Sequence, residues 1–216
     1  MMSPGARQHE KVYAELKQDL LSRGYTAGRD LSVMELATCI GTSVSPVRDA
    51  LHRLYGEGLL EMGDRRGFRV RKWSPEALRD CYTWHGHLIR MALKAGGTAR
   101  LDGLAVDGWS IDCGAIDCGP PDRIVAAAEH MFLRIARMSG SDELVAAVRN
   151  AGERLRAVRF VEAERWPDCG EELAAANALA ASGSVRALLA ALWNYHRRRI
   201  RAARVLCEAI RRSTPD

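Results

Sequence analysis

The sequence lacks any apolar run close to the roughly 20 residues that a helix needs to cross a bilayer. Its first residues, MMSPGARQHE, also lack the apolar core that a secretory signal carries. We therefore expect a cytoplasmic protein with no membrane partner. In that setting the six cysteines are expected to be reduced thiols rather than a disulfide framework.

A strong charge imbalance is absent as well. Lys and Arg number 32 against 27 Asp and Glu, which gives a formal charge of +5. This mild excess permits a polyanionic partner without requiring one. The sequence shows no activated nucleophile and no cofactor-binding loop, so we expect no cofactor and favour a role other than catalysis. Its 216 residues suffice for a small domain followed by a larger one.

The first part of the chain shows the periodicity of short helices. Apolar residues recur every four positions over 10–23, which predicts one helix. Ser32 and Glu35 have the spacing of a capping box at the start of a second helix, which ends at Gly41. After a third helix, the alternating stretches LLEM and FRVR, separated by GDRRG, predict a β-hairpin. Residues 1–73 are therefore expected to form a winged helix-turn-helix.

The third of these helices starts in the stretch TSVSPVRDALHRL, residues 42–54. Ser43 can cap the free N–H groups, and Pro46 falls in the first turn, where a missing N–H costs nothing. The apolar residues turn inward at helical spacing, and the opposite face then carries Ser45, Arg48 and His52. What this face binds is the main question that the sequence raises.

The rest of the chain, residues 74–216, has helical patterns throughout except over 101–122. The predicted fold class is therefore mainly α, with an all-α helical bundle as the second domain. The first expected helix begins at Ser74-Pro75-Glu76. The other expected helices cover 121–138, 142–165, 171–181 and 184–212.

Residues 27–74 resemble the N-terminal domain of the GntR family of transcriptional regulators. The most specific pieces are the run 43–51 with Pro46-Val47-Arg48 at its centre, Gly58-Leu59-Leu60, and Gly67 followed by Val70. This resemblance implies a third helix in the DNA major groove, a hairpin tip in the minor groove, and a homodimer on a palindromic double-stranded operator.

Under this resemblance Arg48 reaches a phosphate or a guanine, and cations at the hairpin tip enter the minor groove. The alternative is that these side chains are ordinary solvated surface. The predicted DNA-binding residues are Ser43, Ser45, Arg48, His52, Arg65, Arg66 and Gly67.

Two basic residues typical of the family are absent. The position directly after the capping serine is Val44, and the position before the Glu of the second helix is Met34. Losing a bidentate contact costs about 1–3 kcal/mol of base discrimination. We therefore expect an unusual operator or weak DNA affinity.

The second domain resembles the FCD (FadR-like) group of this family, most recognisably in FLRIARMSGSDEL. In that group an Asp and three His often hold a divalent metal beside a small carboxylate ligand. The matching positions here are Glu129, Leu133, Leu173 and His196. Because the two leucines cannot bind a metal, we predict that this metal site is lost.

A different site can occupy the same region. His85 stands where many members have an Arg that reaches into the pocket, and it can converge with Glu129 and His196. Trp84 and Trp193 each neighbour one of these histidines, so the five residues form a candidate effector pocket. The alternative is a pair of core histidines whose nitrogens are satisfied by hydrogen bonds.

The stretch 101–122 contains Asp-Cys-Gly twice, with Cys113 and Cys118 as its thiols. The pair can bind a metal or form a switchable disulfide. The alternative is a loop, or a lid, with incidental cysteines.

The sequence therefore predicts a transcriptional regulator whose affinity for an operator responds to a small-molecule effector in the helical domain. One alternative is a repurposed member whose helical cavity carries out chemistry in a biosynthetic pathway, with vestigial DNA binding. The other is a protein-interaction module with neither activity.

Overall fold

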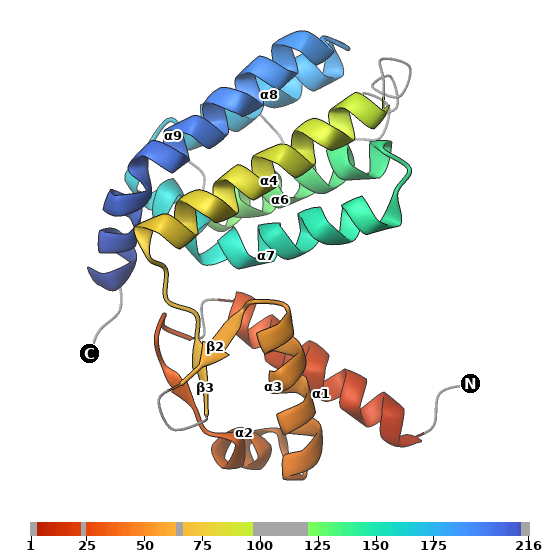
Figure 1. Cartoon of the computed structure of the whole chain (residues 1–216), viewed down its shortest axis with the longest axis vertical. Helices are drawn as coiled ribbons and strands as arrows, with labels where there is room; N and C mark the ends of the chain where they lie inside the picture. Colours follow the sequence, from red (N-terminus) through yellow and green to blue (C-terminus); the bar gives the residue numbers. More distant parts are fainter. Residues whose placement is uncertain (1–3, 23–24, 64–66, 97–120, 213–216) are drawn as a thin grey trace. The chain divides into compact units, whose positions relative to one another are not determined.

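The computed structural model describes residues 4–22, 25–63, 67–96 and 121–212 (Figure 1). These residues are mostly helical, with one small antiparallel sheet. The expected fold class, mainly α with an N-terminal winged helix-turn-helix and a helical second domain, is confirmed. The chain divides into two compact units, with the boundary between Trp73 and Ser74.

The first unit contains the expected three helices and hairpin. The sheet has the order β1-β3-β2, and both of its pairings are antiparallel. The short strand β1 was not predicted, because two residues are too few to show an alternating pattern. The elements are α1 (Pro4–Leu21), β1 (Asp30–Leu31), α2 (Val33–Ile40), α3 (Val44–Gly56), β2 (Leu60–Met62) and β3 (Phe68–Val70).

The predicted helix ends are partly confirmed. The Ser32 hydroxyl accepts a hydrogen bond from the Glu35 amide at 3.3 Å, and Gly41 ends α2 with a φ of 72°. The expected cap of α3 is wrong: Ser43 occupies the N-cap position but its side chain makes no capping hydrogen bond. A capping side chain bonds the N–H of the second or third helical residue, and the third residue here is Pro46, which has none.

A small apolar core fixes the orientation of α3. Val47, Leu51 and Leu54 of this helix are completely buried, as predicted, and they pack with Leu16 of α1 and Phe68 of β3. Burial of this stripe turns the opposite side of α3 toward solvent.

The second unit is a bundle in which α4, α6 and α7 pack against one another and α8 packs on α6 and α7 (Figure 1). The sequence has a stripe at helical spacing along α4, and all five of its residues are buried: Leu78, Tyr82, His85, Leu88 and Ala92. No helix in the described ranges is long and apolar enough to span a membrane. The helices are α4 (Pro75–Gly96), α6 (Pro121–Met138), α7 (Asp142–Arg165), α8 (Cys169–Ala181) and α9 (Val185–Arg212).

The cysteines fall into two groups. Cys39, Cys81, Cys169 and Cys207 are free thiols. Cys113 and Cys118 lie outside the described residues.

Candidate functional site

The outward side of α3 carries the residues that the sequence singled out for DNA contact. Ser43, Ser45, Arg48 and His52 are all exposed. The His52 ring packs edge-on against Phe68, with ring centroids 4.9 Å apart and an interplanar angle of 84°. This contact joins the α3 face to the hairpin. Gly67 directly precedes β3, and Arg65 and Arg66 lie outside the described residues.

The two positions that depart from the family pattern have different surroundings. Met34 is 69% exposed on α2, so an apolar thioether faces solvent at this position. Val44 is half-buried and packs against the core of the first unit. The side chains of Met34 and Val44 can therefore offer DNA only apolar contact.

Polar contacts hold α1 against α3, and sequence reasoning missed them. The Tyr13 hydroxyl donates to Glu57 at 2.6 Å, and Lys17 pairs with the same carboxylate at 2.9 Å. Burial raises the pKa of Tyr13, and the neighbouring Glu57 raises it further. Arg53 pairs with Glu10 at 2.8 Å. These bonds fix the direction in which α3 presents its exposed face.

In the second unit several polar side chains are buried in the bundle. They come from α4, α7 and α9, and we call them the buried polar cluster. Its members are His85, Arg159, Glu162, His196 and Arg199.

The two histidines form a directed chain of hydrogen bonds. His196 Nδ1 lies 2.6 Å from the Leu192 carbonyl oxygen, which can only accept, so Nδ1 carries a hydrogen. His196 Nε2 is then an acceptor for His85 Nδ1 at 2.9 Å. His85 Nε2 in turn accepts from Arg159 Nη2 at 3.4 Å. Both imidazoles are therefore neutral in this arrangement.

Electrostatics favours the same protonation state. Burial lowers the pKa of His85 well below its usual value, and the cation of Arg159 lowers it further. Burial lowers the pKa of His196 to about 3. The ring nitrogens of both side chains are occupied by hydrogen bonds, which is the geometry of satisfied core histidines.

The other three residues of the expected five-residue pocket have different surroundings. The Glu129 carboxylate forms an ion pair with Arg156, because a half-buried carboxylate is stabilised by the nearest cation. Trp84 and Trp193 are 49% and 50% exposed. The expected convergence of Glu129 with His85 and His196 is therefore wrong as a direct contact.

The residues at the positions that the sequence analysis matched to the FCD metal site do not fit a metal ion. The imidazole of His196 is engaged, Glu129 is ion-paired, and the side chains of Leu133 and Leu173 carry no donor atom. Within the described ranges, no group of three or more His, Cys, Asp or Glu side chains is placed to hold a metal.

Arg199 is the centre of an ion network that the sequence did not reveal. Its guanidinium is 1% exposed and donates to Glu162 at 2.8 Å and to Glu172 at 2.9 Å. The Tyr82 hydroxyl donates to the same Glu162 carboxylate, and Arg199 lies over the Tyr195 ring at 3.3 Å. The network ties α4, α7, α8 and α9 together.

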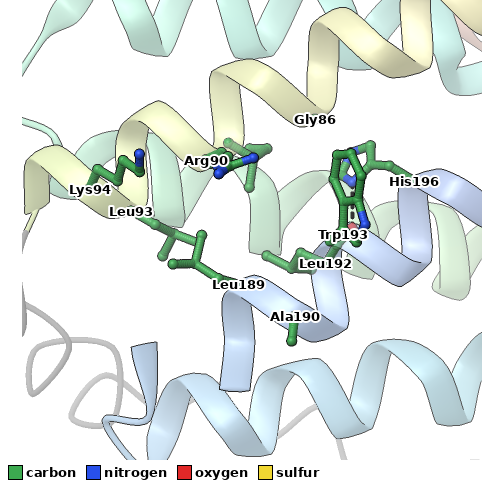
Figure 2. Close-up of a pocket in the computed structure, with 10 residues that line it drawn as sticks. Gly86, Arg90, Leu93, Lys94, Leu189, Ala190, Leu192, Trp193 and His196 are labelled. Carbon is green, nitrogen blue, oxygen red and sulfur yellow. Dashed lines mark hydrogen bonds between the residues drawn. The ribbon is translucent and has the colours of Figure 1, made fainter. Parts of the chain in front are cut away.

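A pocket of about 340 Å³ opens between α4 and α9 (Figure 2). Of the five residues expected to form an effector site, Trp193 and His196 line it. We call it the α4–α9 pocket. The lining residues are Gly86, Ile89, Arg90, Leu93, Lys94, Leu189, Ala190, Leu192, Trp193 and His196.

Comparisons with known proteins identify the first unit. Residues 8–70 match the family model described as "Bacterial regulatory proteins, gntR family". The chain is 27% identical over 144 residues to the Nta operon transcriptional regulator of Aminobacter aminovorans, covering 66% of this chain and 69% of that protein. It is 30% identical over 72 residues to the uncharacterized HTH-type transcriptional regulator YdhC of Bacillus subtilis (strain 168), covering 33% of this chain and 32% of YdhC.

Solved structures share the whole fold at low identity. A GntR protein from Rhodococcus sp. RHA1 superposes with a TM-score of 0.71 at 18% identity, covering 91% of this chain and 97% of that one. E. coli McbR/YncC gives a TM-score of 0.66 at 20% identity, covering 94% and 98% of the two chains. Residues 8–70 therefore form a domain similar to that of the GntR family, and the match and its relatives support a DNA-binding transcriptional regulator.

Proposed function

We propose that this regulator acts as a homodimer whose operator affinity is changed by a small molecule bound in the helical unit, as in the FCD group. Such a ligand acts by binding one arrangement of the dimer more tightly than another. The observation that carries the DNA-binding half of the proposal is the exposed polar face of α3 within a domain that matches the family model.

The proposed DNA contacts follow from this placement. Arg48 near the start of α3 is the anchor, because a guanidinium can make a bidentate contact to guanine or hold a phosphate. Ser43 and Ser45 suit phosphate oxygens beside the helix N-terminus. His52, held against the hairpin by Phe68, contacts the adjacent groove edge. Arg65, Arg66 and Gly67 complete the proposed contact at the hairpin tip.

The effector half of the proposal is supported by the second unit. Its pocket between α4 and α9 is preformed, and it touches His196 of the buried polar cluster. A ligand there contacts two helices at once, so its binding energy depends on how those helices are spaced.

The test of the DNA contact is Arg48→Ala, with Arg201→Ala as the matched control. Both arginines are exposed on helices, and the control removes the same charge from α9. We expect the Arg48 variant to bind operator DNA roughly 5- to 150-fold more weakly, since one good bidentate contact is worth about 1–3 kcal/mol. The control should bind like the unaltered protein. Equal binding by all three proteins would remove the proposed role of α3.

A further inference from the structure

Helix α4 carries a second stripe of residues, on the side that faces away from the bundle. Its members recur at intervals of four and three residues, which is the spacing with which one helix packs along another. All of them are exposed, whereas the buried stripe of α4 packs into the bundle. We call this set the outer stripe. Its members are Asp80, Trp84, His87, Met91 and Lys94.

The middle of the outer stripe is apolar. Trp84 is 49% exposed and Met91 is 51% exposed. Trp193 of α9, which is also half-exposed, lies beside α4 where both helices line the pocket (Figure 2). Among the described residues of the second unit, the large apolar side chains that remain exposed are these three and Val205. Large apolar side chains that gather on one surface are typical of a contact with another protein chain.

The ends of the outer stripe carry opposite charges. Asp80 precedes the apolar pair and Lys94 follows it. Within the described ranges neither side chain forms an ion pair, although Glu76 and Arg79 of the same helix pair with each other at 3.3 Å. Asp80 and Lys94 lie about 21 Å apart along the helix, since each residue adds about 1.5 Å, so they cannot pair with each other. Both charges can therefore pair with another chain.

We propose that two copies of this chain pack their α4 helices antiparallel along the outer stripe, around a two-fold axis beside His87. Asp80 and Lys94 are each seven residues from His87, so the axis places Asp80 opposite Lys94 of the partner subunit. Trp84 and Met91 are three and four residues from His87, so the indole of one copy meets the thioether of the other. An aromatic ring and a methionine sulfur attract each other.

The order of the charges favours a second copy of the chain over other partners. A nucleic acid or an acidic protein segment meets repulsion from Asp80, and a basic segment meets repulsion from Lys94. A second α4 that runs in the opposite direction satisfies both residues at once. The inference rests on the proposed function in taking the regulator to be a homodimer, and it names the surface through which the dimer forms.

The test exchanges the two charges and measures association of the full chain by sedimentation equilibrium. Asp80→Lys and Lys94→Asp each place like charges opposite one another in both symmetric contacts. We expect each variant alone to dissociate about tenfold more readily than the unaltered protein, because two partly exposed pairs are lost and replaced by repulsion. An equimolar mixture of the two variants has opposite charges in both contacts, so it should associate like the unaltered protein.

Rescue on mixing separates the proposed contact from a defect in folding, because two misfolded variants would not restore each other. The matched controls are Glu143→Lys and Arg149→Asp, which change exposed charges on α7 outside the outer stripe. We expect each control to associate like the unaltered protein, alone and mixed. Trp84→Ala, which removes an exposed side chain from the apolar middle, should weaken association while circular dichroism shows an unchanged helix content.

Two results would overturn the inference: a dimer that neither charge variant weakens, or weakened variants that mixing does not restore. Either result leaves the proposed homodimer in place with a different contact surface. An unaltered protein that stays monomeric would overturn the inference and the homodimer together. A dimer that depends on the outer stripe but selects no operator would support the inference and count against the proposed function alone.

Discussion

Acidification from pH 7 to pH 5 should destabilise the protein through His85 and His196. Each imidazole titrates near 6.5 in an unfolded chain, while burial holds the folded pKa of His85 well below that value and that of His196 at about 3. Below about pH 6.5 the unfolded state binds protons that the folded state does not, so stability falls as pH falls. The loss from His196 is about 2 kcal/mol over this interval, and His85 adds to it in the same direction.

The charged groups around the histidines reinforce this direction. Arg159 faces His85, and Arg199 and Arg159 both lower the pKa of His196. A loss of about 2 kcal/mol or more is a substantial part of the roughly 5–15 kcal/mol by which domains are stable. Unfolding in urea at pH 7, 6 and 5, followed by helical circular dichroism, measures it.

A matched variant separates the buried histidines from the exposed ones. His87→Gln removes an exposed imidazole from the same helix as His85. His87 is the last of the named groups that lower the pKa of His196, after burial and two arginines, so the loss of stability should change only slightly. A free energy of unfolding that changes by less than about 1 kcal/mol between pH 7 and pH 5 would refute the neutral, buried assignment.

Two further predictions concern stability. Glu162→Gln should lower the free energy of unfolding, measured in urea, by about 3–5 kcal/mol, because it leaves the Arg199 cation buried without its main partner. The partly exposed Glu172→Gln should cost less than about 1 kcal/mol, and equal losses would contradict the burial argument. Gly41→Ala should lower stability by about 1 kcal/mol, because φ there is 72°. Gly56→Ala, at a helical position with open space around it, should raise stability by about 0.5 kcal/mol, and thermal melting distinguishes the two signs.

The elements of the fold could be predicted because their signals are local. Apolar spacing and capping residues such as Ser32 and Gly41 depend on neighbours within a few positions. The two-residue strand β1 was missed because it exists only through its pairing with β3. The prediction of a Ser43 cap was wrong for a local reason: Pro46, which marks the helix start, lacks the N–H that the serine hydroxyl would accept from.

The candidate sites could be predicted only in part. The exposed face of α3 followed from its buried stripe, but the buried polar cluster did not follow from composition. The burial of Glu162 could have been predicted from its position, because it continues the buried stripe of Leu155 and Val158 on α7. The role proposed for Asp80 and Lys94 depends on which side of α4 the bundle leaves exposed, and that is set by tertiary packing.

The central claim is that this chain reads a specific DNA sequence through α3. The direct measurement is selection from a genomic fragment library at near-physiological salt, where nonspecific attraction to phosphates is screened. We predict that a palindromic site is enriched by the unaltered protein and that Arg48→Ala loses the enrichment. The absence of any enriched site with folded protein would contradict the claim.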